Sequence, residues 1–206
     1  EWLGKIIDKA QKGKDYGQLL KAQLQRAAAQ TQIAPDSADV ELSRLEKTAS
    51  EVKDPVMKAV YATVLGKLYE QRSGNDEAKA TSKRWFAVVM EQPALLAQHR
   101  CVEYEPAVVE GVDSKIFNDD LLHVVGMEAK AYKALQKYYE SKGNRSAACI
   151  SACLGLRYGQ EIDTYEKRKS KYLQAIDSLI RKYGDLSEAG ELAIERSLFL
   201  LGAPDV

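Results

Sequence analysis

A polar turn that contains glycine recurs four times along this chain, each time between two stretches with helical periodicity. The four turns lie at 12–15, 73–76, 142–145 and 183–186. Glycine adopts the left-handed conformation that ends a helix at little steric cost, and a following Asp, Asn or Ser accepts hydrogen bonds from the free N–H groups of the next helix. Each turn therefore predicts two antiparallel helices, and the whole chain predicts a stack of such pairs.

Apolar residues between the turns recur at the i, i+3, i+4 spacing of a helix that buries one face. The widest stripe follows Asp54-Pro55, a pair that predicts an N-cap and a proline at the first helical position. Its members are Val56, Met57, Val60, Tyr61, Val64, Leu65, Leu68 and Tyr69. We expect this helix to be the centre of the N-terminal half. The other predicted helices cover 2–12, 15–32, 36–52, 76–91, 118–141, 145–158, 163–183 and 187–201, with a short helix after Gln92-Pro93 and a capping box from Asp163 to Glu166.

The predicted fold class is all-α, an irregular stack of antiparallel helix pairs that resembles tetratricopeptide units. The best copy is 138–148 (YYESKGNRSAA), with a tyrosine-rich helix end, a Gly-Asn turn and following alanines, and 183–189 (YGDLSEA) is another. The turn glycines are 61, 69 and 41 residues apart. Because a regular unit has roughly 34 residues, we expect a degenerate αα-hairpin superhelix.

We expect one helical domain over 1–206, with an N-terminal helical half at 1–100 and a C-terminal half at 118–206. The chain opens inside a predicted helix without a signal peptide, and its last helix stops at Gly202-Ala203-Pro204. We therefore interpret it as a module excised from a larger chain.

The segment 101–117 does not fit a helix, because it contains Pro106, Gly111 and β-branched residues without helical periodicity. It predicts a long non-helical crossing loop, and long ordered loops often carry function. Acidic residues outnumber Lys115 by six to one over 101–120. The loop is either a structural crossover with a solvated acidic edge or a contact surface for another domain or protein. The candidate partner-binding residues are Glu103, Tyr104, Glu105, Glu110, Asp113, Asp119 and Asp120.

The last predicted helix is apolar nearly all round, so we expect a neighbour to cover it. Leu198, Phe199 and Leu201 form the candidate interdomain patch.

Composition excludes several classes of partner. Thirty basic and thirty acidic side chains cancel, so the chain lacks the electrostatic footprint of a nucleic-acid-binding protein. The sequence has no run near the roughly 20 apolar residues that a membrane helix needs, so we expect no membrane insertion. A mean hydropathy of -0.38 is ordinary for a globular protein.

The sequence contains little that predicts chemistry. Cys101, Cys149 and Cys153 form no C-x-x-C pair, so neither a zinc finger nor a disulfide framework is indicated, and we expect buried thiols. Asp119, Asp120 and His123 have the spacing of two metal ligands on one helix face, but a capped helix start with a packed His123 is the favoured interpretation. No glycine motif that binds phosphate is present. We therefore predict no enzyme, cofactor or metal site.

Four stretches together resemble the helical region near the N-terminus of very large bacterial alpha-2-macroglobulin family proteins. They are 54–61 (DPVMKAVY), 65–69 (LGKLY), 104–106 (YEP) and 113–123 (DSKIFNDDLLH). The resemblance, which extends over most of 1–200, implies an exported protein of the cell envelope or extracellular space. It also implies that macroglobulin β-domains, a protease-bait segment and sometimes an internal thioester lie outside this module. The thioester motif Cys-x-Glu-Gln is not matched by 101–104 (CVEY).

Two functions follow as hypotheses. The first is a non-catalytic helical scaffold of such a protease-trap protein, which binds other domains of its parent chain or another protein through the helix-stack groove and the acidic loop. The alternative is a free-standing TPR-like adaptor that binds a peptide or small ligand. The first predicts an apolar patch that a neighbouring domain covers, whereas the second predicts a melting temperature that a ligand raises.

Overall fold

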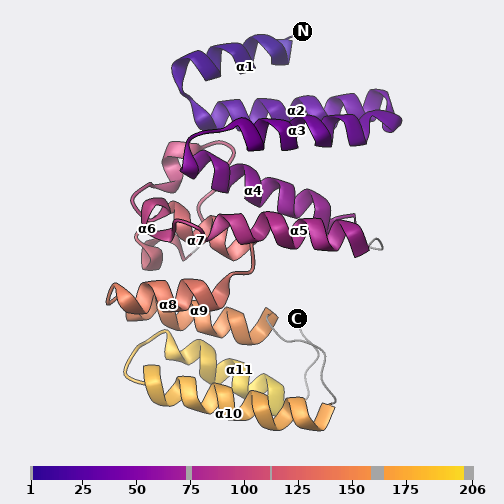
Figure 1. The fold of residues 1–206 in the computed structure, drawn as a ribbon. Helices are drawn as coiled ribbons and strands as arrows, with labels where there is room; N and C mark the ends of the chain where they lie inside the picture. The colour runs from indigo at the N-terminus through magenta and orange to yellow at the C-terminus, as the bar shows by residue number, and fades with distance from the viewer. Residues whose placement is uncertain (1, 73–75, 112, 159–164, 202–206) are drawn as a thin grey trace. The chain divides into compact units, whose positions relative to one another are not determined.

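The computed structural model describes residues 2–72, 76–111, 113–158 and 165–201, and these residues form an all-α fold. Antiparallel helix pairs dominate it (Figure 1). The α-helices are α1 (Trp2–Gly13), α2 (Tyr16–Ile33), α3 (Ala38–Glu51), α4 (Pro55–Glu70), α5 (Asp76–Val89), α6 (Pro93–Leu96), α7 (Leu121–Glu128), α8 (Tyr132–Ser141), α9 (Arg145–Tyr158), α10 (Tyr165–Tyr183) and α11 (Ala189–Leu201). Three short 3-10 helices are η1 (Pro35–Ser37), η2 (Cys101–Tyr104) and η3 (Ser114–Phe117). The predicted all-α fold class is confirmed.

Contacts within the chain divide it into two compact units, Glu1–Ala129 and Lys130–Val206. The boundary lies between α7 and α8, so the segment 101–117 belongs to the first unit.

The core of the first unit is organised around α4, which packs against α3, α5 and α7. Tyr61 and Leu65 on this helix are 1% and 0% exposed, as expected for its wide apolar stripe. The Tyr61 hydroxyl donates a 2.6 Å hydrogen bond to Gln23 Oε1, which ties α4 to α2. Asp54 Oδ1 accepts hydrogen bonds from the backbone N–H groups of Val56 and Met57 at 2.8 and 3.0 Å, so the predicted N-cap of α4 is confirmed.

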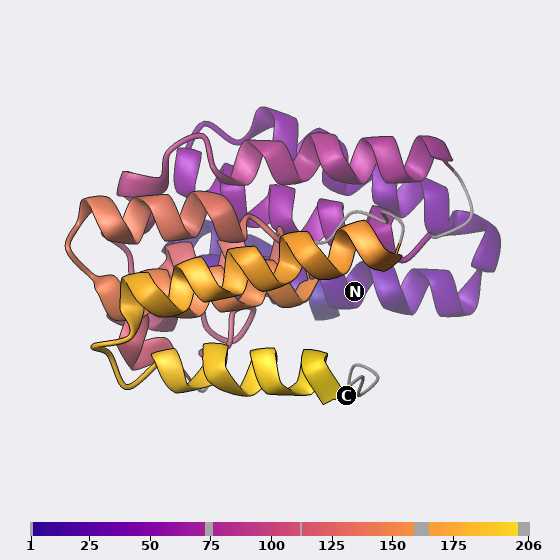
Figure 2. The same ribbon diagram turned by 90° about the horizontal axis from the view of Figure 1, so that it is seen from below.

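The second unit consists of the pairs α8–α9 and α10–α11. Figure 2 shows α10 and α11, in orange and yellow, as antiparallel neighbours joined by a turn. Its core includes the fully buried side chains Leu135, Tyr139, Ile176, Tyr183 and Leu192. Glu140 accepts hydrogen bonds from Lys182 and from the Tyr183 hydroxyl, which joins α8 to the end of α10.

The four predicted turns differ in how they are built. In the third, Gly143 has φ +77° and Asn144 Oδ1 accepts a hydrogen bond from Ala147 N at 3.1 Å, as predicted. In the first, Lys14 rather than glycine is left-handed at φ 55°, so the predicted left-handed glycine is wrong there. The predicted cap is confirmed, because Asp15 Oδ1 accepts a 3.1 Å hydrogen bond from Gln18 N. Gly184 is not left-handed either. The turn at 73–75 and the capping box at 163–166 lie outside the described residues.

The predicted helix over 118–141 is wrong, because the chain forms two helices there. Asn118 and Asp119 are left-handed at φ 58° and 54°, which delays the start of α7 to Leu121. Lys130, left-handed at φ 55°, separates α7 from α8. The intervening residues are good helix formers, but α7 buries its apolar side in the first unit and α8 in the second. Tertiary packing therefore outweighs local propensity at this point.

Candidate functional site

The crossing segment, residues 100–120, is a closed loop whose two ends pair with each other. Arg100 and Asp120 form an isolated antiparallel bridge, and Leu121 N donates a 2.8 Å hydrogen bond to His99 O. The expected non-helical loop is wrong in part, because the 3-10 helices Cys101–Tyr104 and Ser114–Phe117 form its two ends. Short 3-10 turns close backbone hydrogen bonds locally, without the periodicity that identifies an α-helix in a sequence.

The start of this segment lies directly on α2. A Cβ atom built on Gly17 would lie 1.8 Å from the Glu105 carbonyl oxygen, so only glycine lets the two backbones approach this closely. Tyr104 is 4% exposed, and its ring lies 6.4 Å from the ring of Tyr16 and 6.1 Å from that of His99. The segment is therefore anchored on the first helix pair.

Three of the predicted partner-binding acids have partners within the protein. Glu103 accepts a 2.8 Å hydrogen bond from Arg100 N and contacts His99 Nδ1 at 2.8 Å, and these contacts lower its pKa. Asp119 pairs with Arg100 at 2.9 Å. Asp120 is buried and caps α7 by accepting a 2.9 Å hydrogen bond from His123 N.

The other members of that set divide between core and surface. Tyr104 is a core residue, whereas Glu105, Glu110 and Asp113 are exposed. The structure therefore leaves three of the seven predicted residues as a solvated acidic edge. Glu103 and Asp120 have partners three or four residues away, a local signal that could have identified them. The Asp119–Arg100 pair joins residues that are distant in the sequence, so no local pattern predicts it.

His123 is a packed core residue at a capped helix start, as the favoured interpretation predicted. It is 5% exposed, its Nδ1 lies 3.2 Å from Asp120 Oδ1, and its ring stacks on Phe117 at 5.0 Å. Within the described ranges, no group of three or more His, Cys, Asp or Glu side chains is arranged to hold a metal ion.

All three cysteines are free thiols buried in the core. Burial raises the pKa of Cys101 to about 12 and those of Cys149 and Cys153 to about 11. The thiolate is the nucleophilic form of cysteine, so these thiols are unreactive in the folded protein. Cys101 instead donates a 3.1 Å hydrogen bond to the Asp120 carbonyl oxygen.

The predicted interdomain patch is only partly on the surface of α11. Leu198 and Leu201 are 39% and 81% exposed, but Phe199 is half-buried and stacks on Tyr172 at 4.2 Å. Ile194 is 53% exposed. With Leu198 and Leu201 it follows the i, i+4, i+7 spacing of one helix face. We call Ile194, Leu198 and Leu201 the α11 row. The sequence reasoning missed Ile194, although this spacing was a signal that could have identified it.

The inner side of α11 carries a buried carboxylate. Glu195 is 9% exposed and accepts hydrogen bonds from the Tyr172 hydroxyl at 2.8 Å and from Arg157 Nε at 2.9 Å. A charged residue therefore faces the core of the second unit, while the α11 row faces outward. The distribution of apolar residues around the helix could not show that Glu195 faces inward, because this depends on Arg157 and Tyr172 from other helices.

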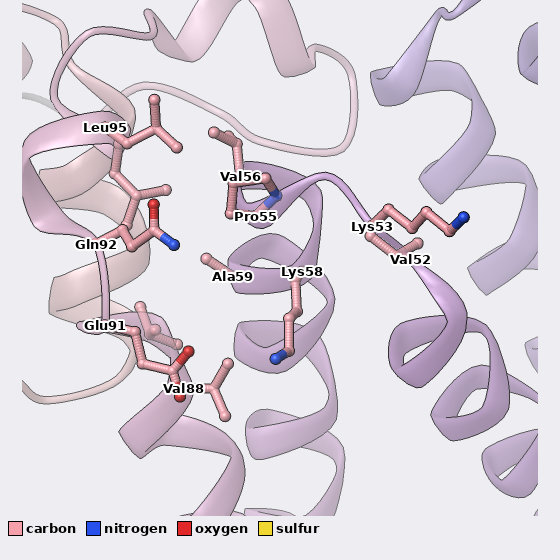
Figure 3. A pocket seen from close by; sticks show the side chains of 12 residues that line it. Val52, Lys53, Pro55, Val56, Lys58, Ala59, Val88, Glu91, Gln92 and Leu95 are labelled. Atoms are coloured by element: carbon pink, nitrogen blue, oxygen red, sulfur yellow. The ribbon is translucent and has the colours of Figure 1, made fainter.

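A groove of about 240 Å³ lies at the start of α4, and the sequence reasoning did not predict it. Figure 3 shows the first turns of α4 facing the segment that joins α5 to α6. The buried part of its lining is apolar, and a lysine and a glutamate stand at its edges. These residues are Val56, Ala59, Val89, Leu96, Lys58 and Glu91. No sequence signal identifies the groove, since its walls come together only through packing.

In the part of the chain that the structure describes, no helix is both long and apolar enough to cross a membrane.

In comparisons with known proteins, no protein-family model, no curated protein and no solved structure matches this chain.

Proposed function

We propose that this chain is a non-catalytic helical scaffold that binds another domain or protein through the α11 row. The observation that supports the proposal is the exposure of Ile194, Leu198 and Leu201 along one side of α11. Single exposed apolar residues are normal on any protein. Three that follow each other at helical spacing form a continuous strip, which is the pattern by which one helix is recognised by another surface.

Burial of this strip would contribute part of the free energy of a specific contact. Full burial of a Leu or Ile side chain contributes about 1.5–3 kcal/mol relative to full exposure. Leu201 has most of its side-chain surface still to bury, Ile194 about half and Leu198 about two fifths. Together they supply several kcal/mol, which is the scale of an interface centre before the costs of association are subtracted.

The acidic edge of the crossing segment is a second contact surface in this proposal. Glu105, Glu110 and Asp113 are exposed, and they favour a basic partner. The buried, unreactive thiols support the non-catalytic part of the proposal.

The parent protein remains a prediction from the sequence resemblance alone. If the parent is a macroglobulin-like protein, the partner of the α11 row is the next domain of the same exported chain. The TPR-like stacking of the helix pairs within each unit is likewise part of this proposal.

Site-specific photo-crosslinking in the source cells tests the α11 row. A benzophenone amino acid is placed at Leu201, and the matched control carries it at Ile33. Both positions end a helix, and they are 81% and 84% exposed. We expect Leu201, and not Ile33, to give one discrete crosslink, either within the parent chain or to another protein. Equal crosslinking at the two positions, or none at Leu201, would refute the proposal.

A peptide-binding adaptor is the second candidate function, and the groove at the start of α4 favours it. That groove lies in the first unit, whereas the α11 row lies in the second.

A further inference from the structure

Helix α1 has an exposed apolar side at the margin of the first unit. It packs against α2, and Figure 1 shows it on the outer side of that pair. Trp2 is 80% exposed, and Ile6, one turn later, is half-buried against the core cluster that contains Ile7. A Cβ added to Gly13, further along the same side, would have no atom within 4 Å. This side of α1 is therefore open, and it carries a tryptophan, a residue type enriched at the centres of interfaces.

The apolar side of α1 and the α11 row each continue into one charged residue. Lys9, three residues after Ile6, is exposed and forms no ion pair with any residue that the structure describes. Glu191, three residues before Ile194, is exposed, and its Oε2 lies 3.9 Å from Arg157. Residues three or four apart share one side of a helix, so each charge extends its apolar side. We call Trp2, Ile6 and Lys9 the α1 edge.

The α1 edge and α11 have the same spacing when the two helices run antiparallel. Successive members are four and three residues apart on each helix, read forward on α1 and backward on α11. The two sets are Trp2, Ile6, Lys9 and Leu198, Ile194, Glu191. With Ile6 placed opposite Ile194, Trp2 faces Leu198 and Lys9 faces Glu191. The apolar residues and the opposite charges therefore match in a single register.

The other charges around these surfaces do not oppose this register. Lys5 and Lys12 are exposed beside the α1 edge, whereas Asp8 lies about a third of a turn away from Trp2. On α11, Arg196 lies on the side opposite the row and pairs with Asp177 at 2.7 Å. The α1 edge is therefore flanked by cations, and the α11 row is flanked by one anion. Surfaces of opposite charge favour contact with each other over contact with a copy of themselves.

We propose that copies of this chain associate head to tail, with the α1 edge of one copy packed antiparallel on the α11 row of the next. Trp2 inserts between Leu198 and Leu201, and Lys9 pairs with Glu191. The chain itself carries both complementary surfaces, so a second copy supplies what each of them lacks. The contact is heterologous, and every added copy leaves one surface of each kind free for another. Because this names the occupant of the α11 row, it rests on the proposed function.

Sedimentation velocity of the purified whole chain tests the association. The surfaces are small, so we expect weak assembly that increases with protein concentration. Trp2→Ala should weaken it at least tenfold, because the indole is the largest exposed apolar group of the contact. The matched control is Ile33→Ala, which changes an apolar residue of similar exposure at another helix end and should leave assembly unchanged.

Mixing two variants tests whether the contact is head to tail. Trp2→Ala keeps an intact α11 row, and Leu201→Asp keeps an intact α1 edge. Each variant alone should stay monomeric at concentrations where the wild type assembles. Their mixture should form a one-to-one dimer and nothing larger, because only one functional surface of each kind remains. Both positions are at least 80% exposed, so neither change threatens the fold.

A charge swap tests the register. Lys9→Glu and Glu191→Lys should each weaken assembly about two- to fivefold, the range of an exposed ion pair. A chain that carries both changes should regain the wild-type assembly, because the pair is then restored in reverse. Lys137→Glu on α8 is the control for net charge, since this lysine is exposed outside both surfaces, and it should have no effect.

Four results would overturn the inference. They are no assembly of the wild type at any concentration, equal effects of Trp2→Ala and Ile33→Ala, a mixture that stays monomeric, and a double charge swap that is no better than the single changes. If the chain does not assemble but the photo-crosslinker at Leu201 gives one discrete crosslink to a different protein, this inference is wrong and the proposed function stands. If both experiments are negative, both proposals are wrong.

Discussion

We expect the substitution Gly17→Ala to destabilise the first unit, although alanine is the better helix former. Alanine is favoured over glycine by up to about 1 kcal/mol inside a helix. At Gly17 the added Cβ would lie 1.8 Å from Glu105 O, well below the 3.0 Å under which real Cβ contacts essentially do not occur. The contacted atom is a backbone carbonyl oxygen, so it cannot rotate away. Overpacking of this kind costs about 1–3 kcal/mol, which exceeds the helix gain in the first turn of α2.

Urea unfolding followed by tryptophan fluorescence measures the stability of the first unit, because both tryptophans, Trp2 and Trp85, lie in it. Gly4→Ala is the matched control: it also lies in the first turn of a helix, and nothing lies within 4 Å of its added Cβ. We expect Gly4→Ala to be neutral or stabilising by up to about 1 kcal/mol. We expect Gly17→Ala to lose about 1–3 kcal/mol and to make the crossing segment easier to cleave by protease. If Gly17→Ala is as stable as the wild type, the segment does not press on α2 and the anchoring inferred above is wrong.

Three further predictions concern groups inside the protein. Iodoacetamide at mildly alkaline pH should leave Cys101, Cys149 and Cys153 unmodified until denaturant is added, because burial raises their pKa values; rapid alkylation of the folded chain, counted by mass spectrometry, would contradict this. Hydrogen bonds from Lys182 and Tyr183 lower the pKa of Glu140 below its ordinary 4.5, so the stability they confer is present above that pH and lost as the pH falls through the lowered value. Unfolding followed by circular dichroism should therefore show a shallower acid dependence for Glu140→Gln, and an unchanged dependence would reject that assignment. Glu195→Leu should cost about 1–3 kcal/mol, because it leaves Arg157 and the Tyr172 hydroxyl without their acceptor; Glu195→Gln should cost less, and a neutral Glu195→Leu in the same assay would show that this buried carboxylate is dispensable.

The sequence predicted most helix boundaries because their signals are local. Asp54 and Asn144 cap the helices that follow them through hydrogen bonds to N–H groups two or three residues away. The apolar stripe around Tyr61 and Leu65 identified the most deeply buried helix of the first unit, because one period of the pattern spans only four residues. Caps and periodicity are properties of neighbouring residues, so they can be read without the fold.

The tertiary structure alone decided where the helical pattern breaks and which residues face solvent. The helix predicted over 118–141 divides at Lys130 because its two parts pack in different units. The anchoring of the crossing segment depends on Gly17 and Glu105, which are distant in the sequence and meet only when the chain folds. Packing between distant segments also turns Ile194 outward and Glu195 inward on α11. It likewise brings together the two walls of the groove at the start of α4. These features arise from contacts between distant segments, which no local pattern encodes.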